Sequence, residues 1–288
     1  MGTPPTRVIS LVPSVTESLF ELGLGERVIG VTDYCVHPED ATRHLPRLGG
    51  TKNPDIERIL ALQPDLVIAN QEENRRVDVE RMQAAGIPVW VTFPCTVQEA
   101  LNLLWQIMEV FDDARMVPRV RLIEQTVDVT ERVEMARTEP CRIFVPIWYE
   151  PLMTFNSGTF AHDLLRVCGG TNIFADCKRN SPMALDLGNE DTGALEESLT
   201  TQRDTRYPRI TWADVEAAQP DVILLPSEPF AFSQEHLALF EALKVPAARA
   251  GRIHLIDGSL LTWHGTRIAR ALATLPSLMC VAEEAQDE

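Results

Sequence analysis

The chain has 288 residues, of which 45% are hydrophobic and 24% are charged, so it is long enough for two domains that each bury a core. Its formal net charge of −16 argues against nucleic acid as a partner, because phosphate groups repel such a surface. No apolar run approaches the ~18 residues of a membrane span, so we expect no insertion into a membrane.

The N-terminal stretch MGTPPTRVISLV passes from a short polar lead directly into an apolar, strand-like run. It lacks the basic segment, the apolar segment and the small-residue cleavage site of a secretory signal peptide. This pattern predicts a cytoplasmic protein, or one from which an export signal has been removed.

Strand-like apolar runs alternate with helical patterns up to residue 111. Ser14 and Glu17 have the spacing of a capping box at the first helix, and Gly23 ends that helix. This alternation predicts a parallel sheet with helices on both faces. The strands are expected at 7–12, 28–31, 66–69 and 89–91, and the helices at 14–22, 54–62, 73–85 and 96–111.

A long helix is predicted from Pro118 to Arg137, because Gly is absent and apolar residues recur at roughly helical spacing. About twenty residues at ~1.5 Å each make a rod of about 30 Å, and Pro140 stops the run. The residues expected on its buried side are Val120, Ile123, Val127, Val133 and Ala136.

After this helix the pattern of the first half restarts. The stretches ILALQPDLVIAN (59–70) and VEAAQPDVILLP (215–226) both place Gln-Pro-Asp between a helix end and an apolar strand. Two matching units imply two similar lobes. We therefore predict an N-terminal lobe at 1–113, a connecting backbone helix at 114–139 and a C-terminal lobe at 140–288. The second set of strands is expected at 141–146, 172–174, 222–225 and 253–256, with helices at 159–167, 211–219, 233–243 and 264–275.

One segment of the second half, residues 181–208, has no counterpart in the first half. It is acidic and carries little apolar content, which predicts a long polar loop. The sequence leaves open whether this loop is a solvated insertion or a lid over a ligand.

The six cysteines are scattered and mostly have apolar neighbours. They include no C-x-x-C pair, so a zinc knuckle is not expected. We predict reduced thiols, because a chain of this size folds without a disulfide framework. The sequence does not decide whether Cys168, Cys177 or Cys280 form a disulfide.

Ligands of open parallel sheets bind beyond the carboxyl ends of the strands. The side chains expected there are rich in aromatic rings, which suit a large, flat, partly apolar ligand. The sequence leaves open the alternative that each ring packs back onto its own lobe. The predicted ligand-binding residues are Ser14, Tyr34, Asn70, Phe93, Trp148, Tyr149, Glu228 and Trp263.

Enzyme signatures are missing, since the chain has no dinucleotide fingerprint, phosphate-binding loop or G-x-S-x-G motif. We therefore predict that the protein is not an enzyme. A zinc or manganese site is a separate possibility, with His37 and His264 as its candidate ligands and Glu150 and Glu228 completing it. The remaining histidines, His44, His162, His236 and His254, carry no pattern that suggests a role.

Several stretches resemble the helical-backbone (class III) substrate-binding proteins of ABC importers. RVISLVPSVTESLFELGLGERVIGVTDYC, PRLGG and QPDLVIA are similar to the first lobe of that family, and SGTFAHDLLRVCGGTNIF, QPDVILL and HLIDGSLLTWHG are similar to its second lobe. The resemblance covers nearly the whole chain. It is closest to the cobalamin-binding branch, followed by the iron–siderophore and haem binders.

The resemblance implies an α/β protein of two Rossmann-like lobes, each with a parallel sheet flanked by helices, joined by one long helix. It implies a cleft between the lobes that binds cobalamin or another metal chelate, such as a siderophore or haem, as a transported ligand, with no intrinsic cofactor. It also implies an ABC permease as partner, a monomer, and a periplasmic or other extracytoplasmic location. By position the cleft would include Tyr34, Asn70, Phe93, Trp148 and Trp263.

The family uses an acidic residue at the tip of each lobe to bind the permease. The candidates here are Glu72 or Glu73 in the first lobe and Glu228 or Glu235 in the second. The chain departs from the cobalamin-binding pattern at Asn70, where an aromatic is usual, and places Arg75 and Arg76 beside the first docking candidates. Two alternatives remain open: a binder of free metal ions, and a cytoplasmic enzyme or sensor built on the same fold.

Overall fold

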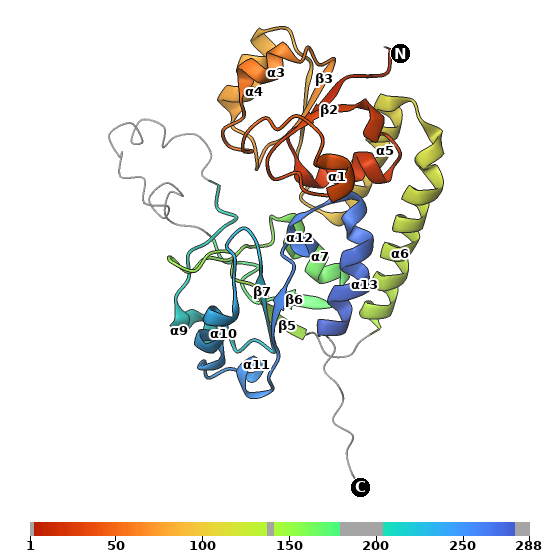
Figure 1. Cartoon of the computed structure of the whole chain (residues 1–288). Coiled ribbons are helices and arrows are strands. Elements are labelled where there is room, and N and C mark those ends of the chain that lie inside the picture. Colours follow the sequence, from red (N-terminus) through yellow and green to blue (C-terminus); the bar gives the residue numbers. More distant parts are fainter. Residues whose placement is uncertain (1–2, 137–140, 179–203, 280–288) are drawn as a thin grey trace, which may run out of the picture. The chain divides into compact units, whose positions relative to one another are not determined.

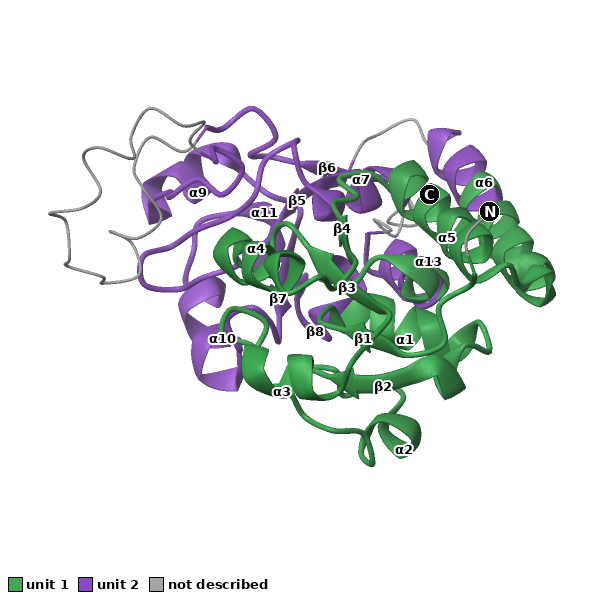
Figure 2. Ribbon diagram, turned by 90° about the horizontal axis from the view of Figure 1, so that it is seen from above, with its two compact units in different colours: residues 1–128, 263–269 green, residues 129–262, 270–288 purple. Residues whose placement is uncertain are grey.

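The computed structural model describes residues 3–136, 141–178 and 204–279 (Figure 1). The chain forms two compact units, coloured separately in Figure 2. Unit 1 takes residues 1–128 and 263–269, and unit 2 takes residues 129–262 and 270–288. The division falls inside the long helix α6 (Val117–Met135), within the connecting segment that we predicted at 114–139. The prediction assigned all of 140–288 to one lobe, whereas residues 263–269 belong to unit 1.

Unit 1 contains a four-stranded parallel sheet in the order β2-β1-β3-β4. Its core joins β1 and β3 to the flanking helices through buried side chains such as Ile9, Val67, Ile59 and Met82. The strands are β1 (Val8–Ser10), β2 (Val28–Val31), β3 (Leu66–Asn70) and β4 (Val89–Thr92). The helices are α1 (Pro13–Glu21), α2 (Glu39–Thr42), α3 (Ile56–Ala61), α4 (Arg76–Ala84) and α5 (Val97–Phe111), with short 3₁₀ turns η1 (Gly25–Arg27) and η2 (Ala114–Met116).

Unit 2 repeats this sheet order as β6-β5-β7-β8, again with parallel strands. Its core is more aromatic, with Phe144, Phe174 and Phe240 packed around Ile223 and Leu225. The strands are β5 (Cys141–Phe144), β6 (Gly170–Asn172), β7 (Val222–Pro226) and β8 (Ile253–Ile256). The helices are α7 (Phe160–Val167), α9 (Trp212–Ala218), α10 (Gln234–Glu241), α11 (Pro246–Arg249), α12 (Ser259–Thr262) and α13 (Ile268–Met279), the last preceded by the 3₁₀ turn η5 (Gly265–Arg267) in unit 1.

The repeated Gln-Pro-Asp stretch folds in the same way in both units. Gln63 and Gln219 each adopt a left-handed backbone, with φ of 49° and 46°. The next Asp in each unit receives the backbone N–H of an arginine, Arg7 to Asp65 and Arg142 to Asp221, at 3.0 Å in both cases. Each arginine also donates to carbonyls at the preceding helix end. The two similar parallel lobes predicted from this stretch are thereby confirmed.

The long helix α6 buries only part of the stripe predicted for it. Val120, Ile123 and Val127 are buried, whereas Val133 is 58% exposed. Val133 is thirteen positions after Val120. Because each residue of an α-helix turns the chain by ~100° about the helix axis, this spacing places the two side chains on different sides of the helix. The prediction that Val133 and Ala136 are buried was therefore wrong. Within residues 3–136, 141–178 and 204–279, no helix combines the length and apolar character needed to cross a membrane.

Candidate functional site

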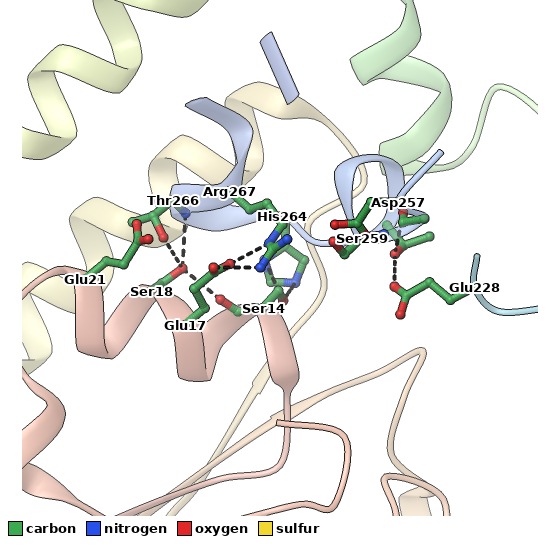
Figure 3. A network of polar contacts seen from close by, with 12 residues as sticks. Ser14, Glu17, Ser18, Glu21, Glu228, Asp257, Ser259, His264, Thr266 and Arg267 are labelled. Atoms are coloured by element: carbon green, nitrogen blue, oxygen red, sulfur yellow. Dashed lines mark hydrogen bonds and ion pairs between the residues drawn. The ribbon is translucent and has the colours of Figure 1, made fainter. Parts of the chain in front are cut away.

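The returning segment 263–269 of unit 1 packs on helix α1, and its contacts are shown in Figure 3. The Arg267 guanidinium donates through Nε and one terminal nitrogen to the two carboxylate oxygens of Glu17, at 2.7 Å each. Glu17 is 1% exposed and Arg267 is 3% exposed. The predicted capping box of Ser14 and Glu17 was therefore wrong, because α1 begins after Val12 and Glu17 faces Arg267 instead.

Two further contacts fix this segment. The Thr266 backbone N–H donates to Ser18 Oγ at 3.1 Å, and Ser18 in turn donates to the Ser14 carbonyl at 2.8 Å. Gly265 has a φ of +87°, and a side chain there would collide with Ser18. Glycine is therefore required at this turn, both because the backbone has a positive φ and because there is no room for a Cβ atom.

Four of the predicted site residues come together in unit 1. Ser14 Oγ lies 3.3 Å from His264 Nε2, and both side chains are buried. Burial lowers the pKa of His264 to about 4, so its imidazole is neutral at pH 7. Trp263 packs edge-on against His37 at 5.6 Å and lies under the Arg267 guanidinium at 4.6 Å. Ser14 thus contacts His264, and His37 contacts Trp263, the residue that directly precedes His264 in the sequence.

The other unit 1 candidates differ strongly in exposure. Tyr34 is 62% exposed and presents a large ring to solvent. Asn70 is buried, and its side-chain oxygen accepts the Glu72 N–H at 2.7 Å, so its amide shapes the loop after β3. Phe93 is half-buried beside a small pocket of about 230 Å³. That pocket is lined by β4, Phe93, Pro94 and one face of α5.

The acidic loop after β3 carries Glu72 and Glu73. The Lys52 ammonium donates to the Glu72 carbonyl, and partial burial lowers the pKa of Lys52 against the opposing effect of Glu73 and Glu72. The neighbouring arginines are engaged on their own helix, since Arg75 pairs with Asp78 and Arg76 with Glu80, both at 2.7 Å.

In unit 2 the predicted aromatic residues belong to a continuous set of rings. Trp148 contacts Phe230 edge-on at 5.6 Å, and Tyr149 contacts Phe230, His236 and Trp212 at 6.1, 5.4 and 6.3 Å. Trp148 also donates its indole N–H to the Glu150 carbonyl at 3.1 Å. Both predicted rings thus rest on their own unit, as the alternative interpretation expected, while remaining half-buried rather than enclosed.

The two unit 2 docking candidates also differ. Glu228 accepts the Thr262 hydroxyl at 2.5 Å, whereas Glu235 is exposed in the first turn of α10. A carboxylate in the first helical turn is favoured by the helix dipole.

The best-supported identification comes from comparison with known proteins. The sequence model of the family described as "Periplasmic binding protein" matches residues 8–260. The chain belongs to this periplasmic binding protein family. Its lobes, each with a parallel four-stranded sheet flanked by helices, agree with that membership.

Curated relatives of this periplasmic binding protein include the vitamin B12-binding proteins of Yersinia pestis (strain Pestoides F) and Yersinia pseudotuberculosis serotype O:1b (strain IP 31758). Each is 32% identical over 173 residues, which cover 60% of this chain. The matched region spans 61% of the length of those relatives.

Solved structures with the same fold include the periplasmic vitamin B12 binding protein BtuF of Vibrio cholerae, with a TM-score of 0.76, 21% identity and coverage of 96% of this chain and 98% of that one. The periplasmic heme-binding protein RhuT from Roseiflexus sp. RS-1 in its apo form has a TM-score of 0.72, 22% identity and the same coverage. The resemblance to this class of binding proteins is confirmed, as is the predicted α/β fold.

Metal-binding and thiol chemistry are limited in the part of this binding protein that the structure describes. No group of three or more His, Cys, Asp or Glu side chains there is placed to hold a metal ion. Cys35, Cys168 and Cys177 are free thiols. Burial raises the pKa of each, that of Cys168 to about 12. Cys280 and most of the predicted insertion at 181–208 lie outside the described residues.

Sequence reasoning missed two residues that organise these regions. Arg267 holds the returning segment, and its only signal in the sequence was a positive charge, shared with Arg270, in the mainly apolar stretch that follows His264. His236 was predicted to have no role, yet it contacts three aromatic rings in unit 2.

Proposed function

We propose that this chain is the substrate-binding protein of an ABC importer, and that it carries cobalamin or a related metal chelate outside the cytoplasmic membrane. The observation that carries the proposal is the match to the periplasmic binding protein family over residues 8–260, together with 32% identity to vitamin B12-binding proteins. The chelate is transported cargo rather than a cofactor, the partner is a permease, and no catalytic step is involved.

The aromatic side chains support a flat ligand with an apolar surface. Tyr34 is exposed after β2, and Trp148 and Tyr149 are half-buried after β5. Rings of this kind stack on a corrin or porphyrin face and lose little conformational entropy when they do so. We propose that these residues, with Trp263, provide the main contacts, and that Ser14, Asn70, Phe93 and Glu228 line or support the site.

Calorimetric titration with cyanocobalamin, haem and a ferric siderophore tests this function. We expect saturable one-to-one binding of one of these chelates, quenching tryptophan fluorescence. Trp148→Ala should weaken binding by about tenfold or more, equivalent to ~1.4 kcal/mol. The control is Trp105→Ala, because Trp105 lies on α5 and donates to Glu124. A folded protein that binds none of the three chelates would overturn the proposal.

A second matched pair tests the first unit. Tyr34→Ala removes an exposed ring, whereas Val36→Ala removes an exposed aliphatic group from the same loop. Neither change should alter folding, because both side chains are exposed on the surface. Weaker binding in Tyr34→Ala alone supports a direct ligand contact, and equal affinities in both variants remove Tyr34 from the site.

Permease docking is proposed through Glu72 or Glu73 in unit 1 and through Glu235 in preference to Glu228 in unit 2. Glu235 is exposed, while Glu228 is engaged by Thr262. Stimulation of the permease ATPase in liposomes measures docking. Glu235→Gln should reduce that stimulation, and Glu241→Gln, an exposed carboxylate at the far end of the same helix, should not. Equal stimulation by both variants would exclude Glu235.

A further inference from the structure

The imidazole of His236 lies at the centre of the aromatic surface of unit 2. Its ring meets Tyr149, Phe230 and Phe232 in edge-on contacts at 5.4, 5.1 and 5.6 Å. Phe230 in turn contacts Trp148 at 5.6 Å. A displacement of the His236 ring would therefore shift Phe230, and through Phe230 it would shift Trp148.

A hydrogen bond fixes the orientation of this imidazole. The Ser233 backbone N–H donates to His236 Nδ1 at 3.2 Å, and the Ser233 hydroxyl lies 3.0 Å from the same nitrogen. A backbone N–H can only donate, so Nδ1 carries no proton in this arrangement. His236 thus occupies the position that Glu or Gln takes in a capping box at the start of α10.

We propose that His236 is a positioning residue which, as a neutral hydrogen-bond acceptor, holds the surface of Trp148, Tyr149 and Phe230 in its ligand-ready arrangement. That this surface receives the ligand rests on the proposed function. The positioning itself rests on the Ser233 bond and the three ring contacts.

Two substitutions test separately the hydrogen-bond acceptor and the aromatic ring of His236. His236→Gln keeps an acceptor at the capping position and has no ring, whereas His236→Phe keeps a ring and has no acceptor. In the ligand-free protein, the Trp148 indole N–H resonance, assigned by its loss in Trp148→Phe, reports the arrangement. We expect Gln to preserve its chemical shift and Phe to change it. The reverse order would mean that the ring only fills space, which would overturn the proposal.

Titration with cyanocobalamin then links the arrangement to binding. At pH 8 we expect His236→Phe to bind about fivefold more weakly than wild type, and His236→Gln to bind within about twofold, as expected for loss or retention of one capping hydrogen bond. Failure of wild type to bind any of the three chelates would refute the proposed function, while the ligand-free resonances would still decide the role of His236.

Discussion

Glu17 and Arg267 are 250 residues apart in the sequence and form a buried, two-point ion pair. The pair joins helix α1 to the segment that returns to unit 1 late in the chain. Trp263 lies under the same guanidinium, and His264 contacts Ser14 one turn earlier on α1. A proposed ligand contact therefore depends on the placement of a segment that this ion pair holds.

Removal of the carboxylate should destabilise the protein strongly. Glu17→Ala leaves the Arg267 guanidinium buried without its carboxylate partner, and changes of this kind cost about 3–5 kcal/mol of unfolding free energy. Glu80→Ala on α4 is the control, because Glu80 pairs with the exposed Arg76 and its loss should cost below about 1 kcal/mol. Urea denaturation measures both, and equal losses would contradict the expectation.

The double replacement Glu17→Met with Arg267→Met gives a second check on this pair. Replacing both charges with apolar groups of similar length removes the desolvation cost along with the attraction, so much of the loss should be recovered. The free energy of unfolding of the double variant should exceed that of Glu17→Ala. A double variant as unstable as the single one would show that other contacts of these residues dominate.

His264 should make stability depend on pH. Burial lowers its pKa from 6.5 to about 4, so between these values the unfolded chain binds a proton that the folded chain does not. Folding stability from this group is therefore complete above pH 6.5 and falls as the pH drops towards 4, by about 3 kcal/mol in total. His162 and His254, whose pKa values burial also lowers, add changes of the same sign.

The variant His264→Asn tests this dependence, because an amide can still bond Ser14 but does not titrate. The free energy of unfolding, measured from pH 7 to pH 4, should fall less steeply in the variant than in wild type. If the two curves of unfolding free energy against pH differ only by a constant amount, that difference reflects the loss of the ring volume and not of a titrating group. Parallel curves would show that His264 does not carry the pH dependence.

Local patterns in the sequence predicted the fold well. In Gln-Pro-Asp at 63–65 and 219–221, the Gln adopts a left-handed backbone and the Asp carboxylate accepts a backbone N–H. In each case the partners belong to the same lobe, so a local pattern is enough to predict them. Trp148 and Tyr149 could be selected from the sequence because they follow a predicted strand, and the carboxyl ends of parallel strands lie at the same edge of a sheet.

Long-range partners could not be predicted in this way. The capping box expected of Ser14 and Glu17 has the right spacing, but Arg267 and His264, some 250 residues away, compete for those side chains. Periodicity also overestimated the buried side of α6, because a spacing of thirteen residues departs from the helical repeat. The first difference arises from tertiary contacts that short windows of sequence do not contain, and the second arises from the geometry of the helix itself.

The paired left-handed glutamines give a comparative prediction. Gln63→Gly should raise the free energy of unfolding by up to ~1 kcal/mol, because glycine adopts positive φ without the steric cost of a Cβ atom. Gln63→Ala, which keeps the Cβ atom, should give no gain. Gln219→Gly should gain less, because the Gln219 side chain donates to the carbonyls of Glu216 and Lys244. Equal gains at both positions in thermal denaturation would contradict this account.

Asn156 joins chain segments on either side of residues 179–203. Its side-chain nitrogen donates to the carbonyls of Cys177 and Thr205 at 2.9 Å each, and its oxygen accepts the Gly158 N–H at 3.0 Å. Asn156→Ala should lower the free energy of unfolding by about 1–3 kcal/mol, since two carbonyls and one N–H lose a partner in a poorly hydrated place.

The variant Asn156→Asp identifies which of these bonds matter. It keeps the acceptor for Gly158 but removes both donated bonds and turns a carboxylate towards two carbonyl oxygens, so it should destabilise at least as much as Asn156→Ala. Asn102→Ala, at an exposed position on α5, is the control and should change stability by less than about 0.5 kcal/mol. Wild-type stability of Asn156→Asp in urea denaturation would show that the two carbonyls do not depend on Asn156.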